Sequence, residues 1–214
     1  MKRVIKILFF ALIVKPVVFV VLGLNIRGRE NLPEGGAVIA PNHNSHLDTL
    51  VIMSLYPLSK IHKIRPLAAA DYFMKNRFIS WISTNCIDII PLDRSGDSTQ
   101  EELFKKPHEA LQNGDVLILF PEGSRGKPEQ MTRLKKGLYY LLKDKKDIPI
   151  FPVAMQGLGN TLPKGEALFV PFNCQIVIGN AIAIPENSHT LNENLKEFFE
   201  ANLTHNINLI KDKG

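Results

Sequence analysis

The sequence predicts a single α/β domain with a mixed, largely parallel sheet flanked by helices, preceded by an N-terminal helical hairpin. Three observations lead to this prediction. The chain has 214 residues, enough for one domain with a sizeable core and short for two. Short apolar runs alternate with helical patterns after residue 24, which is typical of an α/β sheet. Residues 25–214 contain no repeat, low-complexity tract or linker, so we expect one domain there.

The first 24 residues are apolar, apart from a basic start and a Lys15-Pro16 pair in their middle. The two apolar halves, 7–14 and 17–24, are each too short to span a bilayer, and the Lys-Pro pair should break a helix. No small-x-small cleavage site follows, which argues against a signal peptide. We therefore expect residues 1–24 to form a kinked hairpin that enters one leaflet from the cytoplasmic face. A pair of buried core helices is the alternative.

The remaining elements follow from hydrophobic periodicity. Strands are expected at residues 37–40, 67–70, 87–90, 116–120, 148–153 and 175–178. Helices are expected at residues 45–55, 78–84, 99–112, 136–144 and 191–210. The last helix carries Leu195, Phe199 and Leu203 at helical spacing, which predicts packing on the sheet rather than a partner-binding stripe.

Composition restricts the partners. The net charge of +5 favours an anionic lipid surface, a phosphate-bearing substrate or an acidic carrier protein. No nucleic-acid-binding motif is present, and the basic residues have no aromatic interleaving, so no nucleic acid is expected. Cys86 and Cys174 each lie in an apolar run and are expected to be buried and reduced. Neither a disulfide nor a metal site is predicted.

Three of the expected strands run directly into polar residues. Residues 37–40 lead into Pro-Asn-His-Asn-Ser-His-Leu-Asp, residues 87–90 into Pro-Leu-Asp-Arg, and residues 116–120 into Pro-Glu-Gly-Ser-Arg-Gly. Ligands of open α/β folds bind beyond the carboxyl ends of strands. The three clusters therefore predict one shared polar site.

The first cluster places His43 five positions before Asp48. On a regular helix the two side chains would lie about 140° apart, so they can meet only if His43 precedes the helix. Ser45 offers a helix start, with Asp48 three residues on, in the pattern of a capping box. A carboxylate on one imidazole nitrogen would leave the other nitrogen as a base. The alternative is that Asp48 only caps its helix.

The other two clusters contain arginines that suit a phosphate. Gly123 and Gly126 let the backbone bend and expose amides beside Arg125, although a plain turn is the alternative. Position 122 lacks the glycine of a serine nucleophile elbow, and no Walker A sequence is present. Arg94 could hold a second phosphate oxygen or pair with Asp93 at the surface.

Together these clusters resemble the lysophosphatidate acyltransferase family, the 1-acylglycerol-3-phosphate O-acyltransferases. The family's four blocks correspond here to Asn42-His43 with Asp48, residues 90–94, residues 120–125 and residues 148–153. The lead-in at residues 28–33 is also similar to the family's Gly-x-Glu-Asn-Leu-Pro. The resemblance covers about residues 25–180, and the order and spacing of the blocks are specific to the family.

The resemblance implies roles for individual residues. His43 would be the general base and Asp48 its orienting partner. The residues implied in substrate binding are Arg94, Glu122, Gly123, Ser124 and Arg125. Gly126 stands where the family often has a serine, and Leu134 where it often has an aromatic residue, which leaves the acceptor headgroup open.

The expected reaction is direct transfer of a fatty acyl group from acyl-CoA or acyl carrier protein to a lysophospholipid hydroxyl. The expected acceptor is 1-acyl-sn-glycerol 3-phosphate, giving phosphatidate, and the thioester is a substrate, so no cofactor is expected. Backbone amides near Gly123 are expected to stabilise the oxyanion. The alternatives are another lysolipid acceptor, a hydrolase or thioesterase that activates water with the same pair, and a non-catalytic lipid-binding protein.

Overall fold

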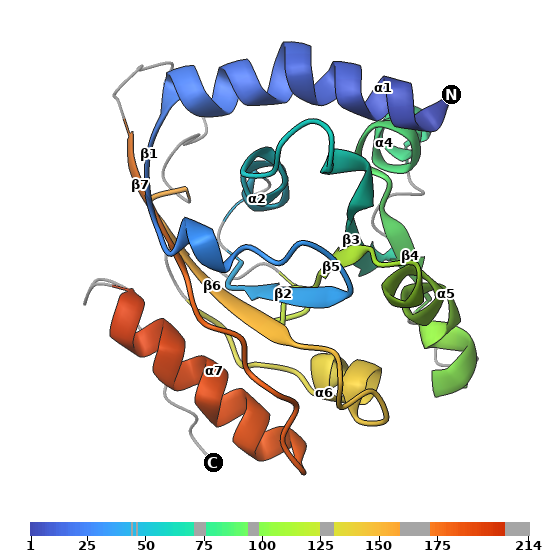
Figure 1. The fold of residues 1–214 in the computed structure, drawn as a ribbon, viewed down its shortest axis with the longest axis vertical. Coiled ribbons are helices and arrows are strands. Elements are labelled where there is room, and N and C mark those ends of the chain that lie inside the picture. Colours follow the sequence, from blue (N-terminus) through green and yellow to red (C-terminus); the bar gives the residue numbers. More distant parts are fainter. Residues whose placement is uncertain are drawn as a thin grey trace.

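The structure is a computed structural model, drawn in Figure 1. It describes residues 1–43, 45, 47–70, 76–93, 99–124, 131–158 and 172–203. Its centre is a seven-stranded sheet in the order β1-β7-β6-β2-β5-β3-β4. The strands are β1 (Leu22–Arg27), β2 (Ala37–Pro41), β3 (Ile64–Ala69), β4 (Ile90–Leu92), β5 (Val116–Ile118), β6 (Ile150–Gln156) and β7 (Phe172–Ile178).

Neighbouring strands are parallel everywhere except between β6 and β7. The prediction of a mixed, largely parallel sheet is therefore confirmed. The strand β2 lies between β5 and β6, and all five of its residues are buried, which explains its continuous apolar sequence. The carboxyl ends of β2 and β5 consequently lie side by side at one edge of the sheet.

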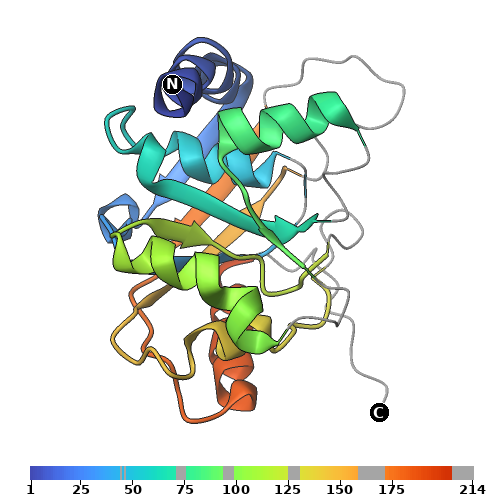
Figure 2. The ribbon, with the colours of Figure 1, turned by 90° about the vertical axis from the view of Figure 1, so that its right-hand side faces the viewer.

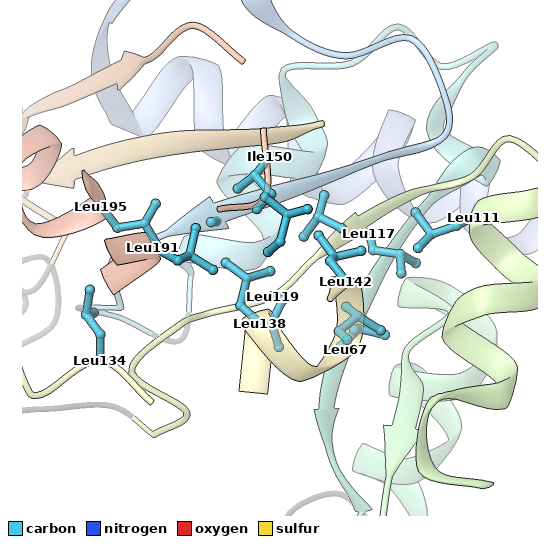
Figure 3. Close-up of a cluster of buried hydrophobic side chains, with 14 of the residues drawn as sticks. Leu67, Leu111, Leu117, Leu119, Leu134, Leu138, Leu142, Ile150, Leu191 and Leu195 are labelled. Carbon is cyan, nitrogen blue, oxygen red and sulfur yellow. The ribbon is translucent and has the colours of Figure 1, made fainter. Parts of the chain in front are cut away.

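Helices cover both faces of the sheet (Figure 1, Figure 2). The helices are α1 (Lys2–Phe9), α2 (Asp48–Ser54), α4 (Arg77–Trp81), α5 (Gln100–Gln112), α6 (Gly137–Leu142) and α7 (Ser188–Asn202). One core lies between the sheet and α5, α6 and α7, where Leu111, Leu138 and Leu191 meet Leu117 and Ile150 (Figure 3). A second core lies on the opposite face, under α2 and the N-terminal helix.

The N-terminal segment is one continuous helix, so the predicted hairpin is wrong. Helix α1 continues without a break into the π-helical segments η1 (Phe10–Val14) and η2 (Val17–Val21). Lys15 and Pro16 between them both have right-handed helical backbone angles. The wider π turns on either side accommodate a proline that has no N–H to donate, which is why Pro16 does not end the helix.

One face of this helix belongs to the second core, and the other face is exposed. Phe10, Val14 and Val18 are almost completely buried, whereas Leu12 is 71% exposed and Val20 is 83% exposed. The helix runs into β1, so the predicted boundary at residue 24 falls inside a strand of the sheet. Among the described residues, no helix combines the length and apolar character needed to cross a bilayer.

Strands β3 and β7 each begin three residues before the predicted start, and the sequence prediction fails more seriously for β1 and β4. Strand β1 was missed, because Leu22 and Leu24 merge with the preceding apolar run and its partner β7 lies far along the chain. Strand β4 begins at Ile90 and not at Ile87, because the helix before it continues through the π-helical segment η5 (Ile82–Ile87). Asp88 then ends that helix with a left-handed backbone conformation.

Helices α5 and α7 begin where the sequence offers a cap. Thr99 and Glu102 form a complete capping box at the start of α5, and the Asn187 side chain accepts the Thr190 amide at the start of α7. Helix α7 buries Leu195 and Phe199, as the sequence predicted, but it begins at Ser188 and ends at Asn202, so Leu203 lies just beyond it and not within a helix that continues to residue 210. Cys86 and Cys174 are both buried and free.

Candidate active site

The site begins where β2 leaves the sheet. Beyond Pro41, the side chain of Asn42 takes over the backbone pairing with β6. Its Nδ2 donates to the Met155 carbonyl at 2.9 Å, and its Oδ1 accepts the Met155 amide at 2.7 Å. Asn42 is 1% exposed, so these bonds are shielded from water. The chain can therefore turn out of the sheet at His43 from a fixed position.

His43 and Asp48 form the pair that their spacing predicted. The distance from His43 Nδ1 to Asp48 Oδ2 is 2.9 Å. The Asp48 side chain is completely buried, whereas 17% of the His43 side chain is exposed. An ionised carboxylate can only accept, so Nδ1 carries the proton and Nε2 has the lone pair of a base. His43 indeed precedes the helix, since α2 begins at Asp48.

The loop between them is arranged around the same carboxylate. The Ser45 amide donates to Asp48 Oδ2 at 2.8 Å, and Ser45 Oγ accepts the Leu47 amide at 3.3 Å. Half of the predicted capping box is present, although the helix starts at Asp48 and not directly after Ser45. Asp48 thus holds both the loop backbone and the imidazole ring. His46 and Asn44 lie outside the described residues.

Glu122 connects the second cluster to the first. Its Oε1 accepts the His43 backbone amide at 2.7 Å, which joins the end of β5 to the end of β2. Its Oε2 accepts both the amide of Thr132 at 2.7 Å and the hydroxyl of Thr132 at 2.8 Å. Glu122 is 1% exposed, and burial raises the pKa of its carboxyl while the donors from Thr132 and His43 oppose that rise. Both carboxylate oxygens are engaged by protein donors, a geometry that suits positioning rather than substrate contact.

The turn that contains Glu122 and a neighbouring aromatic ring complete the described part of the site. The Phe120 ring stacks on the His43 imidazole with ring centroids 3.9 Å apart. Gly123 adopts a left-handed conformation (φ +70°), which favours glycine there. Its amide donates to the Phe120 carbonyl at 3.0 Å and closes the turn. The Gly123 amide itself is therefore already engaged, and the expectation that backbone amides near Gly123 stabilise the oxyanion stays a prediction.

The remaining predicted site residues divide into two groups. Ser124 is described and exposed, directly after the turn. Arg94 and Arg125, the two expected phosphate ligands, lie outside the described residues, and their roles stay predictions. Asp93 is the last described residue after β4, which β3 separates from β5 in the sheet.

Sequence reasoning missed three contributions to this site. Asn42 was quoted only as part of a motif, and its pairing with β6 depends on a strand that lies far along the chain. The stacking of Phe120 on His43 follows from the adjacency of β2 and β5, which the spacing of motifs does not reveal. Thr132 carries no local signal at all, since only the folded chain brings it to Glu122.

The fold and the site together define a class of α/β protein. In this class a histidine that is hydrogen-bonded to a buried carboxylate lies at the carboxyl ends of parallel strands. The sequence profile of the Acyltransferase family matches residues 23–156, which is more than half of the chain. The chain belongs to this family. The matched residues include every described residue of the site, from Asn42 to Met155.

Several curated proteins are similar to this chain. A 1-acyl-sn-glycerol-3-phosphate acyltransferase of Pseudomonas aeruginosa is 31% identical over 159 residues, which cover 73% of this chain and 58% of that protein. A chloroplastic 1-acyl-sn-glycerol-3-phosphate acyltransferase of Arabidopsis thaliana is 29% identical over 162 residues, covering 74% of this chain and 43% of that protein. The chain thus spans about half the length of these two relatives.

A solved structure has the same fold. The crystal structure of the 1-acyl-sn-glycerophosphate acyltransferase PlsC from Thermotoga maritima superposes with a TM-score of 0.70. The match covers 94% of this chain and 79% of that chain, at 20% sequence identity.

Proposed function

We propose that this protein transfers a fatty acyl group from acyl-CoA or acyl carrier protein to the free hydroxyl of a lysophospholipid. The proposed acceptor is 1-acyl-sn-glycerol 3-phosphate, and the product is phosphatidate. The observation that carries the proposal is the 2.9 Å contact between His43 Nδ1 and the buried Asp48 carboxylate. The similarity to proteins named 1-acyl-sn-glycerol-3-phosphate acyltransferases supports the choice of acceptor.

In the proposed mechanism His43 acts as a general base. Nε2 removes the proton of the acceptor hydroxyl while the hydroxyl oxygen attacks the thioester carbonyl. The tetrahedral intermediate then collapses, the carbon–sulfur bond breaks, and the imidazolium returns the proton to the departing thiolate. Asp48 holds the ring in the required tautomer and stabilises the imidazolium, and Glu122 fixes the backbone from which the ring projects.

The two arginines of the neighbouring clusters are the proposed acceptor ligands. Arg94 follows β4 and Arg125 follows the turn after β5, and both strands end at the edge of the sheet where His43 lies. A guanidinium can bind two phosphate oxygens at once, which suits a phosphomonoester headgroup.

A membrane location on the cytoplasmic face is part of the proposal. The acceptor stays in the bilayer, while its thioester partner is water-soluble, so the site must work at an interface. The exposed face of the N-terminal helix presents Leu8, Leu12 and Val20 to solvent. Such a one-sided apolar helix suits binding along a membrane surface, with its opposite face packed in the core.

The decisive experiment combines the purified protein with labelled acyl-CoA or acyl carrier protein and a panel of lysolipids, with mass spectrometry as the readout. We expect acyl transfer that depends on the acceptor and is greatest with 1-acyl-sn-glycerol 3-phosphate. Acyl release that proceeds equally without any lysolipid would instead identify a thioesterase. Binding of lipid with no turnover of any donor would identify a non-catalytic protein.

A further inference from the structure

Helix α4 is unusual because its large apolar side chains are exposed. Phe78 is 70% exposed, Ile79 is 46% exposed and Trp81 is 50% exposed. Each residue of this helix is exposed or half-buried, so α4 adds little to either core. Exposed apolar clusters of this kind mark a surface that binds another molecule or a membrane.

The position of α4 links it to the exposed face of the N-terminal helix. Both lie at the end of the molecule opposite α7 in two perpendicular views (Figure 1, Figure 2). Helix α4 also extends toward the side to which β3 points, which is the side of the carboxyl edge (Figure 2). A lipid that approaches His43 from a membrane would therefore meet α4 beside the site.

Charge favours an anionic lipid surface over a protein partner. Residues 1–29 contain no acidic residue and include the exposed Lys2 and Arg3, and residues 76–87 contain no acidic residue and include the exposed Arg77. Basic side chains beside aromatic ones are typical of interfacial segments, because the rings enter the headgroup boundary while the charges contact anionic lipids.

We propose that Phe78, Ile79 and Trp81 form a second membrane contact, which enters an anionic phospholipid surface together with the exposed face of the N-terminal helix. Two separate contacts would fix the orientation of the sheet relative to the bilayer, since one helix alone leaves rotation about its own axis free. The carboxyl edge with His43 would then face the lipid. The choice of lipid as the occupant rests on the proposed function.

Trp81 makes the test direct, because it is the single tryptophan of the chain. The full-length protein is mixed with vesicles of phosphatidylcholine and phosphatidylglycerol, and tryptophan emission is recorded. We expect emission to move to shorter wavelength, and vesicles whose acyl chains carry bromine to quench it. Protein that sediments with the vesicles while its tryptophan emission stays unchanged would overturn the proposal.

A pair of variants distinguishes lipid binding by this surface from non-specific binding to vesicles. Phe78→Ser combined with Ile79→Ser leaves the tryptophan reporter in place, and we expect roughly tenfold weaker vesicle binding because two apolar side chains no longer enter the bilayer. Tyr140→Ser is the matched control, since Tyr140 is 37% exposed on α6, at the opposite face of the sheet. Unchanged binding of the double variant, or a concentration-dependent emission shift without lipid, would contradict a lipid contact.

Activity on a short-chain acceptor dispersed in water distinguishes the two proposals. We expect the double variant to retain wild-type turnover on this acceptor and to lose turnover on acceptor embedded in vesicles. If the wild type turns over neither acceptor but its tryptophan is still quenched by brominated vesicles, the proposed function fails and the membrane contact stands.

Discussion

A buried carboxylate determines which nitrogen of His43 can act as a base. Asp48 Oδ2 receives both the imidazole Nδ1 and the Ser45 amide, and its side chain is fully buried. Stacking on Phe120 fixes the plane of the His43 imidazole. Glu122 accepts the backbone amide of His43. Three separate contacts therefore determine the position of one imidazole, which is the preorganisation that proton transfer needs.

Substitution of the proposed catalytic pair should lower transfer severely without unfolding the protein. We expect His43→Ala to lower turnover by about 10²–10⁴, because the acceptor hydroxyl loses its general base. Asp48→Asn should also lower turnover severely, since an amide can stabilise the wrong tautomer. Turnover is measured with labelled donor, and circular dichroism checks the fold. Near-normal turnover by His43→Ala would contradict the central assignment.

Glu122 gives a prediction that separates positioning from substrate binding. In Glu122→Gln one amide group must face either the His43 amide or the Thr132 amide, so a backbone donor loses its acceptor in both orientations. The unpaired donor should reduce the free energy of unfolding by about 1–3 kcal/mol. Kinetically we expect a lower kcat with little change in the acceptor KM. Glu101→Gln, at an exposed position of α5, is the control.

The two arginines should affect the acceptor and not the donor. Arg94→Ala and Arg125→Ala would each remove a proposed charge-assisted contact to phosphate, which corresponds to about 1.5–3 kcal/mol. We expect roughly ten- to hundredfold weaker apparent acceptor affinity, with the donor KM little changed. Steady-state kinetics with each substrate varied in turn make the measurement. A defect confined to the donor would place these residues at the carrier site.

The His43–Asp48 pair could be predicted from sequence because both partners lie in one short segment with a helix start between them. For Glu122 and His43, the sequence predicts only that both lie at the same edge of the sheet. Their hydrogen bond could not be predicted, because it requires β2 and β5 to be neighbours. Thr132 could not be predicted, because a threonine in a loop looks the same with or without a buried carboxylate opposite it.

At the scale of elements, the N-terminal helix shows how local rules are overridden. A Lys-Pro pair normally ends a helix, yet two π-helical segments around it keep the backbone helical. Packing explains why the break is avoided, since Phe10, Val14 and Val18 must all reach the same core. Strands β2, β5 and β6 were predicted close to their true positions because they are short, apolar and central. The edge strand β1 was not predicted, and the edge strand β4 was predicted with the wrong bounds. The ends of both strands depend on the segments that precede them and on the strands they pair with.

The same helix contains a buried lysine that should make stability depend on pH. Lys6 is 2% exposed, its Nζ donates to the Ile64 carbonyl at 2.7 Å, and burial lowers its pKa to about 8. The unfolded chain therefore binds more protons than the folded chain between pH 8 and the ordinary lysine pKa of 10.5. The contribution of Lys6 to the free energy of unfolding should accordingly rise with pH across that interval.

Comparison with Lys6→Met isolates this effect. We expect the difference in unfolding free energy, wild type minus variant, to increase by about 2 kcal/mol between pH 7 and about pH 9.5. Urea denaturation at the two pH values provides the measurement. Lys60→Met, at a half-exposed position paired with Glu34, is the control and should show no such increase. A difference that stays constant with pH would mean that Lys6 remains charged in the folded chain.

At the scale of the whole molecule, the N-terminal helix both completes the fold and presents an apolar surface. Deleting residues 1–24 would remove part of β1 and uncover the second core, so it would unfold the chain and say nothing about membranes. Substitutions on the exposed face avoid this difficulty. We expect Leu12→Ser with Val20→Ser to shift the protein from the membrane fraction to the soluble fraction at unchanged Tm.

A substitution on the buried face of the N-terminal helix is the control for the exposed-face variant. Val14→Ser places a hydroxyl in the second core, where Val14 is 4% exposed, and should lower the free energy of unfolding by about 1–3 kcal/mol. Fractionation and thermal unfolding of both variants make the comparison. If the exposed-face variant stays with the membrane, this helix is not the anchor.

The pairing of β1 with β7 sets the order in which the molecule can be completed during synthesis. Leu22 is aligned with Phe172, so the first strand has no partner until the ribosome has released almost the entire catalytic region. Throughout that interval the apolar helix before β1 has already left the ribosome and is not yet held in place by the finished sheet. If the protein works at a membrane as proposed, such a nascent chain can reach the lipid surface before its fold closes, and its folding would then finish at the bilayer.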